Sequence, residues 1–263
     1  MRRKMFVSFV LIGFIISFNS CQKEPVAGFT VDKSDVVTGE TITFTNTTVD
    51  GVTYLWDFGD GQTSDIENPT HKYEEEGDYT VKLSAFSKNG KKTNESTTVI
   101  NVKKANEIGY DGNKYPVERA YVEMWGNYYG YYSNYLFALY LVDNSIVIND
   151  QNTNPTTTYT GEGNLIQILL LSSSNTSLTP GTYYFSSNDV AFTFFDGFMG
   201  LGYNLANETG TAINCVGGTV IVSQVGSTYV FDISLSTNEG KIIYGHYEGN
   251  IISYDYRDGK GVL

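Results

Sequence analysis

The chain has 263 residues, of which 41% are hydrophobic and 17% charged, and its formal net charge at pH 7 is −12. Such an acidic surface repels phosphate backbones, so the sequence predicts no nucleic-acid partner. The chain has 21 tyrosines and 27 glycines but no long runs of helix-favouring residues, and this balance favours strands and turns. We therefore expect an all-β protein of a length that suits two domains.

The first 21 residues have the pattern of an export signal. Three basic residues precede an apolar run from Met5 to Phe18, which is followed by Asn19-Ser20 and Cys21. The run is shorter than the roughly 20 residues of a transmembrane helix, so a cleaved signal peptide is the better interpretation. Cys21 resembles the lipidated residue of bacterial lipoproteins, although Phe18 stands where leucine is usual. Gln22-Lys23-Glu24 is similar to the tag that sends Bacteroidota lipoproteins to the cell surface.

This resemblance implies a signal peptide over residues 1–20, a lipidated linker over 21–25 and an outer-membrane location facing the extracellular side. Removing the three basic residues of the signal leaves 14 basic against 29 acidic residues, a net charge of about −15. Membrane attachment is therefore expected from the lipid rather than from a basic patch.

The next segment is marked by the run Trp56-Asp57-Phe58-Gly59-Asp60-Gly61. Apolar residues alternate with polar ones in Ile42–Asn46 and in Gly77–Leu83, as in strands with one buried face. Together with Asn68–Tyr73, these motifs resemble the PKD domain. The resemblance covers residues 26–104 and implies an immunoglobulin-like β-sandwich that acts as a spacer or binding module on an extracellular protein.

Two aspartates of this run have two possible roles. Asp57 and Asp60 flank a glycine turn, where carboxylates commonly accept hydrogen bonds from nearby backbone amides. A calcium site would need further oxygen ligands, and no Asp-x-Asp-x-Asp-Gly spacing is present. We therefore interpret both as turn-stabilising residues and predict no cofactor and no metal.

Residues 105–263 are expected to form a second antiparallel β-domain, a sandwich or jelly roll. Asp111-Gly112 predicts a tight hairpin turn. The stretches Tyr135–Val142 and Leu165–Leu171 are apolar on both faces, which indicates strands covered on two sides. The last 46 residues, from Gly218 on, read as a four-strand meander. Because Cys21 is assigned to the lipid, Cys215 is predicted to be a buried free thiol.

This half also resembles known proteins. Leu178–Tyr183, Gly217–Val220 and Gly245–Gly249 are similar to short motifs in the C-terminal β-domains of gut Bacteroidota surface lipoproteins. Some of these accompany polysaccharide-utilisation systems, in which PKD-like modules space a glycan-binding domain from the membrane. The resemblance implies a polysaccharide or oligosaccharide partner and supplies no catalytic residue.

An aromatic cluster is the main candidate for a glycan site. Tyr121, Glu123 and Trp125 alternate along one face of a predicted strand. Flat aromatic rings stack on sugar rings, and carboxylates bond to their hydroxyls. Tyrosines in β-proteins also pack across strands, so a structural role remains open for each. The rest of the cluster follows directly: Tyr128, Tyr129, Tyr131 and Tyr132.

Two further groups of residues are candidate sites. His246 alternates with Tyr244 and Glu248 on one expected strand face, and is interpreted as an exposed or hydrogen-bonded strand histidine rather than a ligand or base. Phe194, Phe195 and Phe198 flank an expected loop at Asp196-Gly197 and are interpreted as core.

The sequence predicts a protein without catalytic activity. It holds no Gly-x-Ser-x-Gly or His-Glu-x-x-His motif, and its two histidines cannot form a three-histidine metal site. Glycoside hydrolysis needs only two carboxylates, which leaves a sugar-cleaving enzyme as a remote alternative. The main alternative to glycan binding is a protein-binding or structural surface component, such as an adhesin or an accessory of an outer-membrane transporter. The carboxylates that glycoside hydrolysis could use are Glu123, Glu162, Asp196, Asp232 and Glu248.

Overall fold

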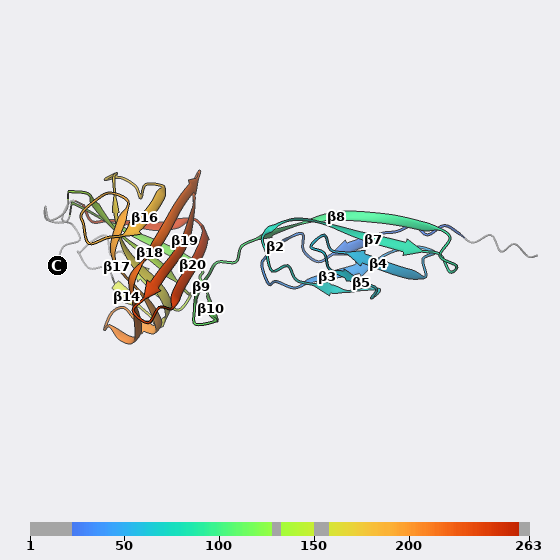
Figure 1. Ribbon diagram of the computed structural model, residues 1–263, viewed down its shortest axis with the longest axis horizontal. Coiled ribbons are helices and arrows are strands. Elements are labelled where there is room, and N and C mark those ends of the chain that lie inside the picture. The colour runs from blue at the N-terminus through green and yellow to red at the C-terminus, as the bar shows by residue number, and fades with distance from the viewer. Residues whose placement is uncertain (1–22, 128–132, 150–157, 258–263) are drawn as a thin grey trace, which may run out of the picture. The chain divides into compact units, whose positions relative to one another are not determined.

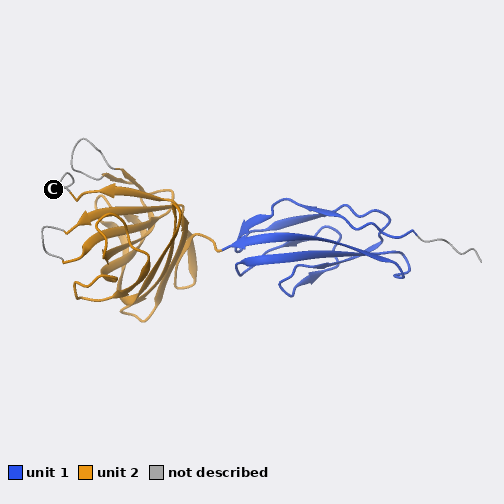
Figure 2. Cartoon of the chain, turned by 90° about the horizontal axis from the view of Figure 1, so that it is seen from above, with its two compact units in different colours: residues 1–103 blue, residues 104–263 orange. Residues whose placement is uncertain are grey.

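The computed structural model describes residues 23–127, 133–149 and 158–257. The chain divides between Lys103 and Lys104 into two compact units (Figures 1 and 2). Across the described ranges every regular element is a strand, which confirms the all-β class. No helix in these ranges is long and apolar enough to cross a membrane.

The first unit is a sandwich of two sheets (Figure 1). One sheet has the order β1-β3-β6, and the other has the order β2-β8-β7-β4-β5. The pairing is antiparallel except where β2 lies parallel to β8. The strands are β1 (Phe29–Val31), β2 (Asp35–Val37), β3 (Ile42–Asn46), β4 (Thr53–Asp57), β5 (Thr63–Ser64), β6 (Thr70–His71), β7 (Gly77–Phe86) and β8 (Thr93–Lys103).

Trp56 is the centre of this first core. Its side chain is fully buried, and its Nε1 donates a hydrogen bond to the carbonyl oxygen of Ile66 at 2.9 Å. Its ring lies 5.5 Å from that of Phe44, which comes from the opposite sheet. The predicted alternation is confirmed, because Ile42 and Leu83 also point into this core.

The second unit contains one continuous sheet of 11 strands and a separate hairpin. The sheet order is β10-β9-β20-β19-β18-β16-β17-β15-β12-β11-β21, and the hairpin joins β13 and β14. The strands are β9 (Glu107–Tyr110), β10 (Asn113–Pro116), β11 (Arg119–Gly126), β12 (Tyr135–Val142), β13 (Val147–Asn149), β14 (Thr158–Thr160), β15 (Gly163–Ser172), β16 (Gly181–Phe185), β17 (Thr193–Asn204), β18 (Thr209–Val225), β19 (Thr228–Thr237), β20 (Ile242–Gly249) and β21 (Ile251–Asp255).

Five of the ten neighbouring pairs in this order join strands that are consecutive in the chain. The pairing is antiparallel except between β16 and β17 and between β11 and β21. The predicted hairpin at the start of the unit is confirmed. Asp111 and Gly112 have φ angles of 53° and 81°, the positive values that a two-residue turn between twisted strands requires.

The sheet has a buried cluster on each face. The inner face encloses one large core that draws on strands from β9 to β20, so the sheet curls around it (Figure 2). Along β15, Ile166 and Ile168 point into this core, whereas Leu165 and Leu169 belong to a second cluster on the outer face. The prediction that Tyr135–Val142 and Leu165–Leu171 are strands covered on two sides is therefore confirmed.

Two local expectations were wrong. The expected loop at Asp196-Gly197 is part of the continuous strand β17, and the irregularity there is a bulge between the pairs Asp196–Leu169 and Phe194–Leu170. The last strand does not fold back on β20. Gly249 keeps an ordinary φ, so the chain continues through Asn250 and β21 pairs in parallel with β11.

Candidate functional site

Strand β11 positions the three described residues of the predicted aromatic cluster. Tyr121 and Trp125 lie with the outer-face cluster, while Val122 and Met124 face the inner core, so the predicted alternation is confirmed. Tyr121 is only 2% exposed and Glu123 is fully buried, and neither presents a surface to solvent. The four tyrosines 128, 129, 131 and 132 lie outside the described residues.

Glu123 is the centre of a hydrogen-bonded network. Its Oε2 accepts hydrogen bonds from the Trp125 indole N–H at 3.2 Å and from the Tyr140 hydroxyl at 3.1 Å. Its Oε1 accepts one from the Tyr159 hydroxyl at 3.0 Å. Burial raises the pKa of Glu123 above the ordinary value, and the three hydrogen bonds oppose that shift only in part. The carboxyl group thus fixes two tyrosines from neighbouring elements.

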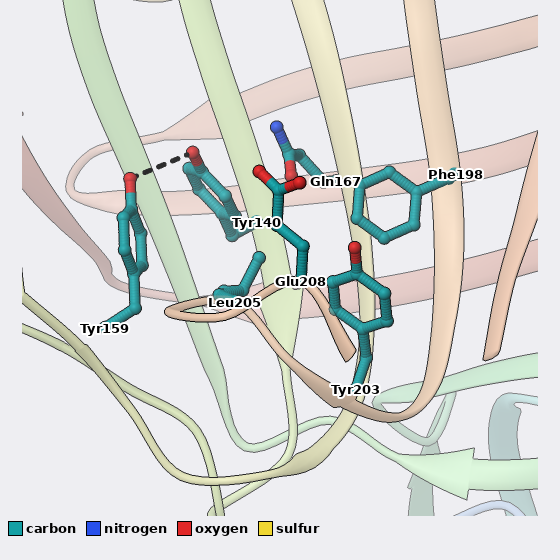
Figure 3. Close-up of a pocket in the computed structure, with 7 residues that line it drawn as sticks. All are labelled: Tyr140, Tyr159, Gln167, Phe198, Tyr203, Leu205 and Glu208. Carbon is teal, nitrogen blue, oxygen red and sulfur yellow. Dashed lines mark hydrogen bonds between the residues drawn. The ribbon is translucent and has the colours of Figure 1, made fainter. Parts of the chain in front are cut away.

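Those two tyrosines form one wall of a pocket of about 360 Å³ on the outer face of the sheet (Figure 3). The other walls come from β15, β17 and the turn between β17 and β18. Four of the lining side chains are aromatic, two carry an amide or a carboxylate, and one is aliphatic. They are Tyr140, Tyr159, Phe198, Tyr203, Gln167, Glu208 and Leu205.

Local sequence explains why the turn between β17 and β18 reaches over the sheet. The side chain of Asn204 accepts a hydrogen bond from the backbone N–H of Ala206 at 3.0 Å, and Asn207 does the same for Thr209 at 3.3 Å. Such local bonds favour turns over continued strands. Glu208 has a φ of 55°, a left-handed conformation that is unfavourable for a residue with a side chain.

The arrangement suits the binding of a small polar ring. Aromatic faces offer apolar contact area, and the amide and carboxylate can bond to hydroxyl groups. The volume lies near the lower end of the roughly 300–1,000 Å³ range of small-molecule sites, which suits one or two rings of a longer ligand. In the described ranges no group of three or more His, Cys, Asp or Glu side chains is arranged to hold a metal ion.

The sequence placed Tyr121, Glu123 and Trp125 on one face of β11 but did not predict the pocket. Tyr140 was read as part of an interior strand and Phe198 as core, because their neighbours are apolar. One signal was available: Gln167 is the single polar residue within the apolar stretch Leu165–Leu171, and its side chain lines the pocket. Of the three phenylalanines, Phe194 is fully buried in the core as expected.

His246, on strand β20, has a structural role. His246 is 5% exposed, and its Nδ1 lies 2.8 Å from Oδ1 of Asp232. The same oxygen accepts a hydrogen bond from Lys104 at 2.7 Å. This agrees with the interpretation of His246 as a hydrogen-bonded strand histidine. Cys215 is buried, as predicted, and burial raises the pKa of its thiol to about 11.

In the first unit, the two aspartates of the glycine turn accept hydrogen bonds that stabilise the turn. Asp57 accepts a hydrogen bond from the N–H of Gly59, and Asp60 accepts one from the N–H of Gln62, both at 3.0 Å. Asp60 also lies 2.8 Å from Nε2 of His71. Burial alone would raise the pKa of Asp60, but its bonds to Gln62 and His71 hold the pKa below the ordinary value.

Comparison with known proteins defines the class of the first unit. Residues 22–102 match the family model of the PKD domain, so this part of the chain is a PKD domain. The PKD1 domain of Vibrio anguillarum Epp is 33% identical over 32% of this chain and 98% of that domain, with a TM-score of 0.28.

Curated relatives match mainly short segments. Collagenase ColA of Bacillus cereus is 52% identical over 48 residues, which are 18% of this chain and 5% of that protein. The microbial collagenase of Vibrio alginolyticus is 45% identical over 67 residues, 24% of this chain and 8% of that protein. The chain thus spans less than a tenth of the length of these two relatives.

A solved structure of carbohydrate-binding modules from the β-sandwich superfamily aligns with most of the chain. It covers 88% of this chain and 85% of its own, at 17% identity and a TM-score of 0.31. A likeness this low carries no information about a ligand.

Proposed function

We propose that the chain is a non-catalytic surface lipoprotein whose second unit binds a glycan in the aromatic pocket. The PKD domain then serves as a spacer. The observation that carries this proposal is the pocket itself, in which four aromatic rings surround an amide and a carboxylate. A sugar ring needs this combination, because its C–H faces stack on flat rings while its hydroxyls form hydrogen bonds.

The proposed binding surface is the pocket on the outer face of the sheet and not the side chains of Tyr121, Glu123 and Trp125 that the sequence indicated. Glu123 supports the pocket from below through its bonds to Tyr140 and Tyr159, and Tyr121 is buried in the same cluster. Trp125 belongs to the same support, because its indole N–H holds Glu123.

Retention on immobilised polysaccharides tests the glycan site. The chain from residue 22 onward is run against a panel of neutral, basic and acidic plant, algal and host polysaccharides. Phe198→Ala and Gln167→Ala are the informative variants, because both side chains line the pocket and are only half-buried. Tyr184→Ala is the matched control, because Tyr184 is 58% exposed and is not among the pocket residues.

We expect at least tenfold weaker retention for both pocket variants. The control should be retained as strongly as the wild type. If both pocket variants were retained as strongly as the wild type, the glycan would have to bind elsewhere. A wild type that no polysaccharide retains would contradict glycan binding and favour the protein-binding or structural alternative, including an accessory of an outer-membrane transporter.

Lipid anchoring is a separate part of the proposal and rests on the residues before the PKD domain. The basic, apolar and cysteine-terminated pattern that ends at Cys21 supports it. Cys21→Ala should abolish incorporation of a labelled fatty acid and release the protein from the outer-membrane fraction. Labelling of Cys21→Ala at the wild-type level would refute the assignment.

A further inference from the structure

The hydrogen-bond directions around Glu123 determine what the pocket offers to a ligand. A tyrosine hydroxyl has one proton to donate and an oxygen that accepts. Tyr140 and Tyr159 both donate that proton to the Glu123 carboxylate, at 3.1 Å and 3.0 Å. The two hydroxyl oxygens also lie 3.5 Å from each other (Figure 3), but the Glu123 oxygens are nearer and take both protons while Glu123 is ionised. Both hydroxyls then present only acceptor oxygen to the pocket.

Glu208 adds a negative charge to the same pocket. Its side chain lines the pocket together with Gln167 and Tyr140 (Figure 3). In the described part of the chain it has neither a hydrogen-bonded partner nor a basic partner, and none of the seven lining residues is basic. The turn that carries this carboxylate is held by the hydrogen bonds that Asn204 and Asn207 accept from backbone N–H groups.

Acceptors thus dominate the pocket. Three tyrosine oxygens and one carboxylate line the pocket, whereas its donors are limited to the Gln167 amide and the Tyr203 hydroxyl. A carboxylate or sulfate on a ligand would meet acceptors and a like charge. A protonated amine would supply up to three donors and a positive charge to the same groups.

We propose that the pocket selects sugars with a free amino group, of the glucosamine type, over N-acetylated and acidic sugars. This inference rests on the proposed glycan site. Glu208 supplies the charge that the amine meets, and Glu123 is a positioning residue, because it acts on the ligand only through the direction of the two tyrosine hydroxyls.

Oligosaccharides of defined chemistry test the preference. The probes are a glucosamine oligomer, its N-acetylated counterpart and a galacturonic acid oligomer of equal length, measured by isothermal titration at about pH 7 and physiological salt. We expect the wild type to bind the glucosamine oligomer at least tenfold more tightly than the other two. The salt limits general attraction of a cationic probe to the acidic chain.

Glu208→Gln removes the charge of the pocket and keeps the shape of the side chain. It should reduce the preference for the glucosamine oligomer about tenfold and change affinity for the N-acetylated oligomer less than threefold. Glu76→Gln is the matched control, because it removes the same charge from an exposed position of the other unit. Equal loss in both variants would mean nonspecific attraction and would overturn the proposal.

Glu123→Gln tests the positioning role. Its carbonyl oxygen can take the place of Oε2, which accepts from Trp125 and Tyr140. Its NH₂ group then faces Tyr159 and donates to it, so the Tyr159 proton turns towards the pocket. The opposite amide orientation would set two donors against each other at Trp125.

The variant should therefore bind the N-acetylated oligomer more tightly and the glucosamine oligomer more weakly than the wild type does. A purely supporting role for Glu123 predicts equal loss for both probes and would overturn this step. The failures of the two proposals are distinguishable. If Phe198→Ala abolishes binding of all oligomers but the wild type shows no amine preference, only the present inference fails. If none of the oligomers binds, it fails together with the glycan site.

Discussion

Truncation of Glu123 to alanine is the sharpest test of the network that supports the pocket. The change removes the acceptor of three donors: the Trp125 indole N–H and the hydroxyls of Tyr140 and Tyr159. A buried donor without a partner costs about 1–3 kcal/mol. The half-buried Tyr159 hydroxyl can turn to water in the pocket, so we count two such losses. We therefore expect Glu123→Ala to lower the free energy of unfolding of the second unit by about 2–6 kcal/mol.

The pH dependence of this loss has a definite sign. The pKa of Glu123 is raised in the folded state, so the folded chain keeps a proton that the unfolded chain has released. The stability that this proton confers is fully present below the unfolded pKa of about 4.3 and is lost as the pH rises through the folded pKa. The difference in stability between the wild type and Glu123→Ala should therefore be larger at pH 5 than at pH 8.

Urea denaturation at a series of pH values measures this difference. The chain has two tryptophans, Trp56 in the first unit and Trp125 in the second, so fluorescence reports on both. The transition of the first unit serves as the internal control and should not move. A difference that shrinks towards acid pH would mean that Glu123 is stabilised as a carboxylate, and a loss below about 1 kcal/mol would mean that the network contributes little.

Three further predictions concern single positions. Gly218→Ala should destabilise the second unit by at least about 3 kcal/mol, because a Cβ there would lie 2.2 Å from a backbone oxygen of β19, whereas Gly226→Ala, also at positive φ but in open space, should cost far less in the same urea assay. Asp60→Asn should reduce the loss of unfolding free energy that the first unit shows below about pH 4. A carboxyl whose pKa is lowered by folding stabilises the fold fully only above its unfolded pKa. An unchanged pH dependence below about pH 4 would show that the bond of Asp60 to His71 contributes nothing. In the native chain from residue 22 onward, Cys215 should resist iodoacetamide because its thiol is buried, and in guanidinium it should be alkylated at this single site. Rapid alkylation of the native chain would contradict this.

The first unit could be predicted closely from sequence because its signals are local. The run from Trp56 to Gly61 combines a core tryptophan with a glycine turn, and flanking strands alternate regularly around it. Each signal specifies a strand or a turn without reference to distant residues. The Asp111-Gly112 hairpin of the second unit was predictable for the same reason.

The pocket could not be predicted in this way, because its walls come from residues up to 68 positions apart that meet only after folding. Alternation places Tyr140 and Gln167 on a face of their strands but does not say what covers that face. The cover is provided by the hairpin that carries Tyr159 and by the turn that carries Glu208, and strand pairing alone does not determine the position of either.

The same limit explains why the aromatic surface was expected around Trp125. A run of exposed-looking tyrosines in the sequence suggests a binding face, whereas the structure buries Tyr121 and Glu123 beneath other rings. Burial depends on the neighbouring strands β12 and β14, and their contacts with β11 are not visible in the spacing of one strand.

The central claim is that the aromatic pocket holds a sugar ring. A crystal structure of the chain from residue 22 onward, soaked with an oligosaccharide from a polysaccharide that retains it, tests this claim most directly. We expect a sugar ring in the pocket, packed against the paired rings of Phe198 and Tyr203, with a hydroxyl or amine bonded to Glu208. An oligosaccharide bound elsewhere, with the pocket filled only by water, would contradict it.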